Sequence, residues 1–445
     1  MKVLLIEPYK NKRDNLDKNY TYPAPGLLSI ASYLESNGIE ADYFPSNTYK
    51  NSQAPLKKAL KKKYDFIGVG TTGYTLKNDL KHIELVKKYS PNSKVVAGGI
   101  YAWLFPQDIL KHSDADYVIR GNGEIPFLKL IQKNKIVPGL CTKTNISKPF
   151  IISNKELAKL PSIIKYSKYN ETYKKYHATR RQLFATLGCP FNCNFCSVPH
   201  MYNHEMRYKP TDLVIADLKE LQKQKIKKVF FVDPDLNVNK KYFLELFGKI
   251  FINKLNNISF SIQARIDLID KDIIKASKKA NIKYFFIGVE SISQKIRDKD
   301  LNKGGKMAKM NEKEIILKLK ELKENKITPF IYLILGTPLT TIKELKENIS
   351  FYNSFKGSYE LNPLIFPHKE TNYYKMYKDS LILHCDLETK YGILSLPSVL
   401  YCKDKKANSL ILSADKEAFK ELKKNKKKHY PSVFMKLLNE KIESI

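Results

Sequence analysis

The sequence predicts an α/β protein in which a doubly wound parallel sheet is followed by a partial (β/α)6 barrel. Short apolar runs recur along most of the 445 residues, and stretches with helical periodicity separate them. Glycine- or proline-containing turns follow several of these runs. Regular alternation of strand and helix is typical of parallel sheets, whose ligands bind beyond the carboxyl ends of the strands.

Residues 1–132 are expected to form the doubly wound, Rossmann-like sheet. The predicted strands are 2–8, 39–44, 65–70, 94–99 and 115–124, and the predicted helices are 26–38, 76–89 and 127–131. Gly38 is placed as the residue that ends the first helix, because glycine adopts the left-handed conformation easily. Residues 133–180 lack this rhythm and are predicted to be a connector.

Residues 181–370 resume the alternation and predict the barrel. The expected strands are 182–188, 227–233, 258–265, 283–290, 328–338 and 362–367, with helical stretches between them. In such a barrel the chemistry lies at the carboxyl ends of the strands. Residues 371–445 show no repeating unit and are predicted to be a small C-terminal extension with a basic, amphipathic end.

The charge of the chain is strongly positive, with 78 Lys+Arg against 45 Asp+Glu and a formal net charge of +33. Arginine is scarce and the lysines are dispersed, which favours a diffuse basic surface over a dedicated nucleic-acid site. The run 423–429 is the best candidate if a polyanion site exists. No apolar run approaches the roughly 20 residues of a transmembrane helix, and the N-terminus turns polar too early for a signal peptide. A soluble, cytoplasmic protein is therefore expected.

The cysteines provide the strongest chemical signal. Cys189, Cys193 and Cys196 have the spacing C-x3-C-x2-C, whereas Cys141, Cys385 and Cys402 are isolated. Three thiolates in one loop can ligate three irons of a [4Fe–4S] cluster and leave the fourth iron open. The alternative is a Cys3His zinc site completed by a histidine at 200 or 204. The position of the loop after the first expected barrel strand favours the iron–sulfur cluster.

The segment 187–200, with the aromatic Phe195 before the last cysteine, resembles the radical S-adenosylmethionine superfamily. The resemblance implies that the cluster cleaves S-adenosylmethionine to a 5′-deoxyadenosyl radical, with Phe195 beside the adenine. Segments 229–237, 286–304 and 330–341 resemble further strand segments of the superfamily. The third expected strand, 258–265, ends with Gln263 and Arg265 as an anion or substrate contact. The residues that these segments place around S-adenosylmethionine are Asp233, Asp235, Gln263, Arg265, Glu290 and Ser291. At 330–341 the sequence departs from the family, because Leu339-Thr340 replaces the usual Gly-Glu.

Residues 1–132 resemble the cobalamin-binding domain that often precedes such barrels, in segments 22–44, 65–75, 95–110 and 116–127. The positions expected to contact cobalamin are Thr71, Thr72, Gly98, Gly99, Tyr101, Gly121, Gly123 and Glu124. Glycine at a strand end allows a nucleotide tail to approach the backbone closely. Tyr101 stands where histidine is frequent, Asn122 where glutamate is frequent, and no D-x-H-x-x-G motif occurs, so no histidine ligand to cobalt is expected. The alternative is a domain that has lost its cofactor.

The two resemblances together imply a radical methyltransferase that acts on an unactivated carbon of a small-molecule substrate. They also imply a reducing electron donor such as flavodoxin or ferredoxin. Relatives with the same two domains carry out ring closure or ring contraction. The charge would favour an RNA-modifying methylthiotransferase, but no cysteine precedes Cys141 to bind the second cluster of those enzymes. A non-enzymatic zinc or nucleic-acid-binding protein is the remaining alternative.

Overall fold

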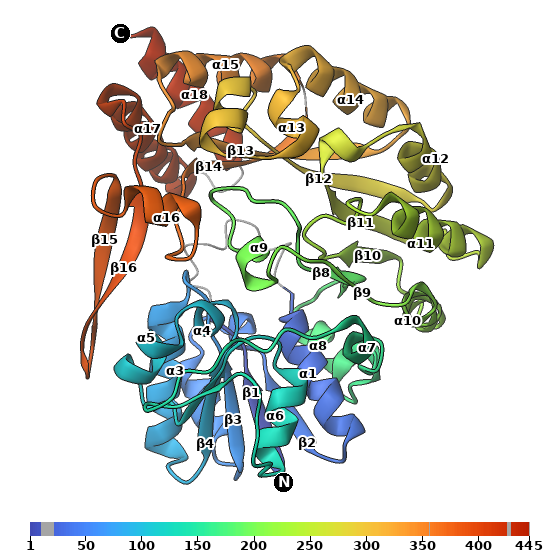
Figure 1. Cartoon of the computed structure of the whole chain (residues 1–445), viewed down its shortest axis with the longest axis vertical. Coiled ribbons are helices and arrows are strands. Elements are labelled where there is room, and N and C mark those ends of the chain that lie inside the picture. The colour runs from blue at the N-terminus through green and yellow to red at the C-terminus, as the bar shows by residue number, and fades with distance from the viewer. Residues whose placement is uncertain (10–21, 356, 425–428, 445) are drawn as a thin grey trace. The chain divides into compact units, whose positions relative to one another are not determined.

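The computed structural model describes residues 1–9, 22–355, 357–424 and 429–444 (Figure 1). It divides into two compact units, each described by itself. Unit 1 comprises Met1–Leu183, Arg207–Lys227 and Asp386–Ser395, and unit 2 comprises Phe184–Met206, Lys228–Cys385 and Leu396–Ile445. Most of the basic run at 423–429 lies outside the described residues, so the candidate polyanion site there has no structural account.

Unit 1 contains the doubly wound sheet that the sequence predicts. The strands are β1 (Lys2–Ile6), β2 (Glu40–Phe44), β3 (Phe66–Gly70), β4 (Lys94–Gly98), β5 (Tyr117–Ile119) and β6 (Leu140–Cys141), in the order β2-β1-β3-β4-β5-β6. All neighbouring strands are parallel except β6, which runs antiparallel to β5. The strand order reverses direction between β1 and β3, and ligands of open parallel sheets bind at such a switch point.

Helices cover this sheet in the positions that periodicity indicates. The predicted helices correspond to α1 (Pro25–Ser36), α3 (Leu76–Tyr89) and α6 (Glu124–Ile131). Gly38 follows α1 with φ of 75°, as expected of a residue that ends a helix. The remaining helical elements of the unit are η2 (Ser46–Thr48), α2 (Gln53–Ala59), α4 (Ile100–Leu104), α5 (Pro106–His112), α7 (Asn154–Leu157), η3 (Ile163–Lys165), α8 (Tyr169–Lys175) and α10 (Thr211–Lys223).

The second sheet has the consecutive order expected of a partial barrel, β14-β13-β12-β11-β10-β7. Its strands are β7 (Arg180–Leu183), β10 (Lys228–Phe231), β11 (Ser259–Ala264), β12 (Ile282–Glu290), β13 (Thr328–Gly336) and β14 (Ser358–Leu364). The pairs from β10 to β14 are all parallel. The helices between them are α11 (Lys240–Ile252), α12 (Lys271–Lys279), α14 (Glu312–Glu324) and α15 (Ile342–Ser354), with the shorter η4 (Ile266–Leu268), η5 (Ile296–Asp300) and α13 (Gly305–Lys309).

The sequence predicts a C-terminal extension at 371–445 but not the elements within it. It consists of α16 (Asn372–Tyr377), the hairpin of β15 (Ile382–Thr389) and β16 (Gly392–Leu400), and the helices α17 (Lys405–Lys424) and α18 (Tyr430–Glu443). Helices α17 and α18 contact each other and the strand β14, as Figure 1 shows. Within the described residues, no helix is long and apolar enough to span a bilayer.

Candidate active site

The three clustered cysteines lie in the loop between β8 (Thr186–Leu187) and α9 (Val198–Met201) of unit 2. None forms a disulfide, and Cys189 and Cys193 are buried. Burial, followed by the nearby Asp235, raises the pKa of the Cys189 thiol to about 12. Its Sγ lies 3.9 Å from Asp235 Oδ2, and Cys193 Sγ lies 3.8 Å from the carbonyl oxygen of Lys303. Three free thiols in one short, buried loop are a donor set that suits an iron–sulfur cluster.

Asn194 fixes this loop from two sides. Its backbone N–H donates to the carbonyl of Leu301 at 2.9 Å, and its side-chain amide donates to the carbonyl of Asp300 at 2.6 Å. Its own carbonyl accepts from the backbone N–H of Tyr373 at 3.0 Å. The segment after β12 and the helix α16 therefore both hold the residue between the second and third cysteines.

Asp300 connects these two segments to the turn after β13. Its carboxylate is buried and accepts hydrogen bonds from Thr337 Oγ1 at 2.6 Å, the Leu339 N–H at 2.7 Å and the Tyr373 hydroxyl at 3.0 Å. Leu339, which departs from the family pattern, thus contributes a polar contact through its backbone. Asp300 and Tyr373 were not predicted as site residues, because their contacts join segments far apart in the sequence.

A buried ion pair stands beside the cysteine loop. Lys303 Nζ lies 3.2 Å from Glu290 Oε1 and donates to the Gly288 carbonyl at 2.9 Å. The same ammonium is 5.9 Å from the centre of the Phe195 ring. Glu290 has φ of 65°, a left-handed conformation that non-glycine residues rarely adopt. Lys303 was missed as a site residue, although it stands in the 286–304 segment that carries the family resemblance.

Glycine is needed at residue 288 because the Glu290 carboxylate lies where a side chain would be. A Cβ atom at residue 288 would lie 2.3 Å from Glu290 Oε1 and 3.1 Å from Lys303 Nζ. Real Cβ contacts are not as short as the first of these distances, so a side chain here would displace the Glu290 carboxylate. The absence of a side chain at 288 therefore maintains the ion pair.

Arg265 joins the loops after β11 and β12. Its guanidinium makes four hydrogen bonds, two to Asp267 and one each to the carbonyls of Lys303 and Gly304. The guanidinium carbon also lies 3.6 Å from the centre of the Phe191 ring, within the cysteine loop. These contacts give Arg265 a structural role, and the ligand contact that the sequence suggests for it stays a prediction.

Asp233 and Ser291 are likewise engaged within the protein. Asp233 accepts from the Ala185 N–H at 3.0 Å and from Thr186 Oγ1 at 2.7 Å, which fixes the chain entering the cysteine loop. Burial raises the pKa of Asp233 to about 6. The Ser291 hydroxyl is buried beside the Asn348 amide, with the two polar groups 3.3 Å apart.

Asp235 and Gln263 are the remaining predicted residues, and both are only partly buried. Burial raises the pKa of Asp235 to about 6, and the charges of Lys303 and Arg265 oppose that shift. Gln263 is near the carboxyl end of β11, where its carbonyl accepts from the Leu236 N–H at 3.0 Å. Asp235 and Glu290 thus provide carboxylates near the cysteines.

The histidines of the zinc alternative lie close to each other. The His200 and His204 ring centres are 5.2 Å apart, and His204 Nδ1 is 3.2 Å from the carbonyl of Phe191. In the described residues, no three His, Cys, Asp or Glu side chains converge as ligands of one metal ion. A [4Fe–4S] cluster instead binds each cysteine at a different iron.

In unit 1 the predicted cobalamin positions lie at or after the carboxyl ends of β3, β4 and β5. The Thr71 N–H and hydroxyl both donate to the Gly98 carbonyl at 2.8 Å. Gly99 has φ of 94°, and a Cβ there would lie 2.7 Å from the Thr71 carbonyl oxygen. At Gly98, by contrast, a Cβ would meet nothing within 4 Å. Gly99 therefore allows the loops after β3 and β4 to approach each other closely, while Gly98 leaves open space for a ligand.

The other predicted glycines also serve internal packing. A Cβ at Gly121 would lie 2.1 Å from the Phe150 carbonyl oxygen, and one at Gly123 would lie 2.8 Å from Ile30 Cδ1. Close packing within the protein thus requires glycine at both positions, and the approach of a nucleotide tail there stays a prediction. At both positions the close neighbour is the protein itself.

Tyr101 and Glu124 are buried and engaged in side-chain hydrogen bonds. The Tyr101 hydroxyl donates to Asp108 Oδ2 at 2.9 Å. Glu124 accepts from the Ser29 hydroxyl at 2.6 Å, and burial raises the pKa of its carboxyl group. Both side chains therefore shape the loops of this sheet edge.

Asp79 organises the loop that contains Thr72. This carboxylate is fully buried at the start of α3 and accepts from the Thr72 N–H at 3.1 Å, Thr75 Oγ1 at 2.5 Å and the Tyr9 N–H at 3.1 Å. Burial raises the pKa of Asp79 to about 8. The sequence predicts a helix at 76–89 but gives no sign that its Asp79 side chain is buried.

Two large apolar side chains near the same edge are exposed. Tyr74, after β3, is 72% exposed, and Ile100, after β4, is 46% exposed. Neither was predicted, although Ile100 directly follows the Gly98-Gly99 pair. Exposed apolar side chains beside a strand edge with open space favour a ligand that has apolar surface.

Comparison with protein families matches both units. The Radical SAM superfamily model matches residues 183–352, and the B12 binding domain model matches residues 18–131. The chain belongs to the radical S-adenosylmethionine enzymes that carry a cobalamin-binding domain. The cofactors of this enzyme are accordingly a [4Fe–4S] cluster, S-adenosylmethionine and cobalamin.

Curated relatives of this radical enzyme are distant. An uncharacterized methyltransferase of Pyrococcus horikoshii is 24% identical over 83% of this chain and 82% of its own length. A putative methylthiotransferase of Methanocaldococcus jannaschii is 30% identical over 51% of each chain, so the present chain spans about half of that relative.

The fold is also that of a solved enzyme. The radical S-adenosylmethionine methyltransferase TsrM of Kitasatospora setae aligns with a TM-score of 0.73 and 13% identity, over 90% of this chain and 86% of that one. At this identity the similarity shows the fold alone. The predicted α/β architecture is thereby confirmed.

Proposed function

We propose that this enzyme is a cobalamin-dependent radical methyltransferase that acts on an unactivated carbon of a small molecule. The observation that carries the proposal is the pairing of a loop of three free thiols in unit 2 with a B12-binding sheet in unit 1. The name of the Pyrococcus relative, which is matched over most of its length, supports methyl transfer.

Cys189, Cys193 and Cys196 are assigned to hold the cluster. When bound, the cluster and S-adenosylmethionine supply reductive cleavage and hydrogen abstraction, and cobalamin supplies the methyl group. Lys303 and Arg265 place positive charge beside the thiols and oppose the rise in the pKa of Cys193 that burial causes. Positive neighbours stabilise ligands that bind as thiolates.

The S-adenosylmethionine site is assigned to Phe195 of the cysteine loop and to three polar side chains at or after the carboxyl ends of barrel strands. Glu290, Asp235 and Gln263 supply polar groups, and Phe195 supplies an aromatic face. Asp233, Arg265 and Ser291 act as positioning residues, because their polar groups are engaged with neighbouring loops. This assignment divides the predicted residues into those that contact S-adenosylmethionine and those that fix the loops.

The cobalamin site is assigned to the ends of β3 and β4. Gly98 leaves the space, Thr72 lies in the loop that Asp79 fixes, and Tyr74 and Ile100 offer apolar surface to the macrocycle. We expect no histidine ligand to cobalt, because the motif that would supply one does not occur. A reducing protein such as flavodoxin or ferredoxin would supply the electron.

The test uses the full chain, purified anaerobically and supplied with iron, sulfide and cobalamin. We expect about four irons per chain and a cobalamin spectrum in which the tail base is detached. Retention of iron and S-adenosylmethionine cleavage without cobalamin binding would contradict the methyltransferase proposal and support a radical enzyme that has lost this cofactor.

A second candidate is methylthio transfer, which the name of the Methanocaldococcus relative favours. Such an enzyme would need a second cluster. Cys141 and Cys402 are buried singly, and Cys385 is exposed on β15. Iron content distinguishes the two proposals, because a second cluster would raise it to about eight irons per chain.

A further inference from the structure

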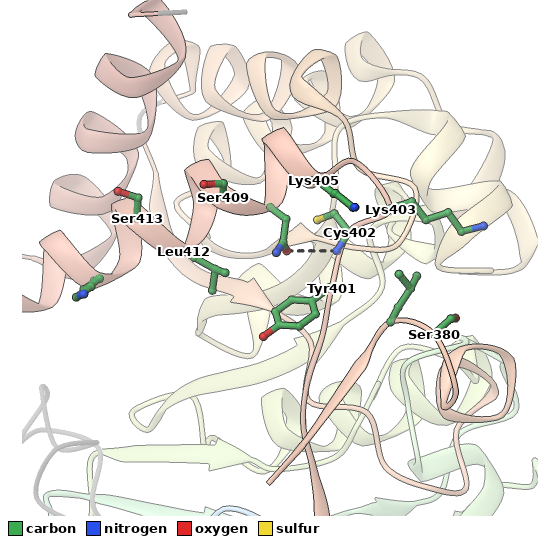
Figure 2. A pocket seen from close by; sticks show the side chains of 11 residues that line it. Ser380, Tyr401, Cys402, Lys403, Lys405, Ser409, Leu412 and Ser413 are labelled. Carbon is green, nitrogen blue, oxygen red and sulfur yellow. Dashed lines mark hydrogen bonds between the residues drawn. The ribbon is translucent and has the colours of Figure 1, made fainter.

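A groove with a volume of about 620 Å³ runs along one face of α17 in unit 2 (Figure 2). The helix contributes Lys405, Asn408, Ser409, Leu412, Ser413 and Lys416, which recur at helical spacing. Residues 380–381 and 401–403 form the opposite wall. The volume is within the range of small-molecule sites. The groove lies beyond residue 352, where the superfamily match ends.

The charged side chains that line the groove are all positive. The lining includes three lysines and no aspartate or glutamate. Two acidic side chains of α17 have partners on α18. Asp415 accepts from the Tyr430 hydroxyl at 2.5 Å, and Glu417 pairs with Lys441 at 2.7 Å. Glu417 also accepts from the hydroxyl of Ser413, which lines the groove, at 3.3 Å, so this acid lies beside the Ser413 end of the groove. The lining side chains themselves carry only positive charge.

The polar groups of the groove are mainly donors. Lys405 and Lys416 have no ion-pair partner in the described part of the chain. Asn408 accepts from the Cys402 N–H at 3.3 Å through Oδ1, which leaves its NH₂ group as a donor. The neighbouring Asp404 caps α17 by accepting from the N–H groups of residues 406 and 407, both at 3.0 Å. Ammonium, amide and hydroxyl donors together suit an anion.

The groove also has an apolar part. Figure 2 shows Leu412 on α17 and Tyr401 on the facing segment. Leu412 is 40% exposed, and Leu381 packs against the apolar cluster that also contacts Phe195 of the cysteine loop. The Lys403 N–H donates to the carbonyl of Pro338 at 2.9 Å, in the turn after β13. The groove is therefore attached to the carboxyl end of a barrel strand.

We propose that this groove binds an amphiphilic anion, that is, an apolar molecule with one carboxylate or phosphate group. Lys405 and Asn408, near the start of α17, contact the anionic group, and Leu381, Tyr401 and Leu412 contact the apolar part. Lys416 stands about 16 Å farther along the helix and adds positive charge at the other end of the groove. The proposal does not depend on the proposed methyl transfer, because binding can be measured without cluster, S-adenosylmethionine or cobalamin.

The experiment measures binding of dodecanoate and dodecyl phosphate to the full chain by calorimetry, below the concentration at which either forms micelles. The test protein carries Lys405→Ala and Lys416→Ala. The control carries Lys406→Ala and Lys420→Ala, which remove the same charge from exposed positions of α17 outside the groove. We expect the test protein to bind about five- to tenfold more weakly, where tenfold is about 1.4 kcal/mol. The control should bind as the wild type does.

A second variant, Ser409→Trp, fills the groove without changing its charge and should also weaken binding. Thermal unfolding shows whether each variant is folded. The tighter of the two probes identifies the preferred anionic group. Equal binding by wild type, test and control proteins, or equal binding of neutral dodecanol and dodecanoate to the wild type, would overturn the proposal.

Discussion

Replacement of Tyr373 by phenylalanine removes one of the hydrogen bonds that the Asp300 carboxylate accepts next to the cysteine loop. Tyr373 is completely buried, and its hydroxyl donates to Asp300 Oδ1 at 3.0 Å. The substitution removes this donor and leaves the ring, so no large cavity forms. A hydrogen bond to a charged group contributes about 1.5–3 kcal/mol. A loss of about 2 kcal/mol lowers the melting temperature of a domain of 150–250 residues by about 4–8 °C.

The assay compares Tyr373→Phe with Tyr377→Phe by calorimetry and by iron content after anaerobic reconstitution. Tyr377 is the matched control, because its ring packs against the same apolar cluster and no hydrogen bond of its hydroxyl is found in the described residues. We expect only Tyr373→Phe to melt earlier and to lose iron faster. An altered electron paramagnetic resonance spectrum of the reduced cluster in that variant would show that the loop has moved. If both variants match the wild type in all three measurements, Asp300 does not position the loop.

Other expected outcomes follow from single contacts. Cys193→Ala should lose iron and all S-adenosylmethionine cleavage, whereas Cys402→Ala, at a buried cysteine outside the loop, should retain both. Gly288→Ala should weaken S-adenosylmethionine binding at least tenfold in equilibrium dialysis, because its Cβ would displace the Glu290 carboxylate. Gly248→Ala, where a Cβ meets nothing within 4 Å, should bind normally. The raised pKa of Asp79 means that the folded state binds a proton between about pH 4 and 8 that the unfolded state does not. Stability should therefore fall as pH rises through this range, and Asp79→Asn should flatten that dependence in denaturant titrations.

The strands of both sheets could be predicted because their apolar runs are short and bounded by turns. Two strands are exceptions. The strand β6 (Leu140–Cys141) lies in the stretch that was predicted to be a connector. The strand β14 begins at Ser358, whereas the predicted strand was 362–367. Its exposed residues alternate with buried ones, as in Glu360 and Leu361. Polar residues within a short strand interrupt the apolar run by which a strand is recognised in the sequence. Pairing with β13 along Phe330 to Gly336 determines where the strand begins.

The cysteine loop was predictable because its ligands are adjacent in sequence, whereas its supports are not. Asp300 contacts Thr337 and Tyr373, which are 37 and 73 residues away. A single sequence does not reveal such pairs. The packing role of the glycines was not predictable for a related reason, because Gly121 is required by Phe150 and Gly99 by Thr71. Sequence alone indicates that a glycine is needed but does not identify the neighbour that requires it.

The central claim is that the loop of Cys189, Cys193 and Cys196 holds a cluster that cleaves S-adenosylmethionine. The most direct measurement is the release of 5′-deoxyadenosine and methionine by the reduced, reconstituted full chain, compared with Cys189→Ala. We predict release by the wild type, with about four irons per chain, and none by the variant. Stoichiometric zinc without iron in protein purified anaerobically, or equal cleavage by the variant, would contradict the account.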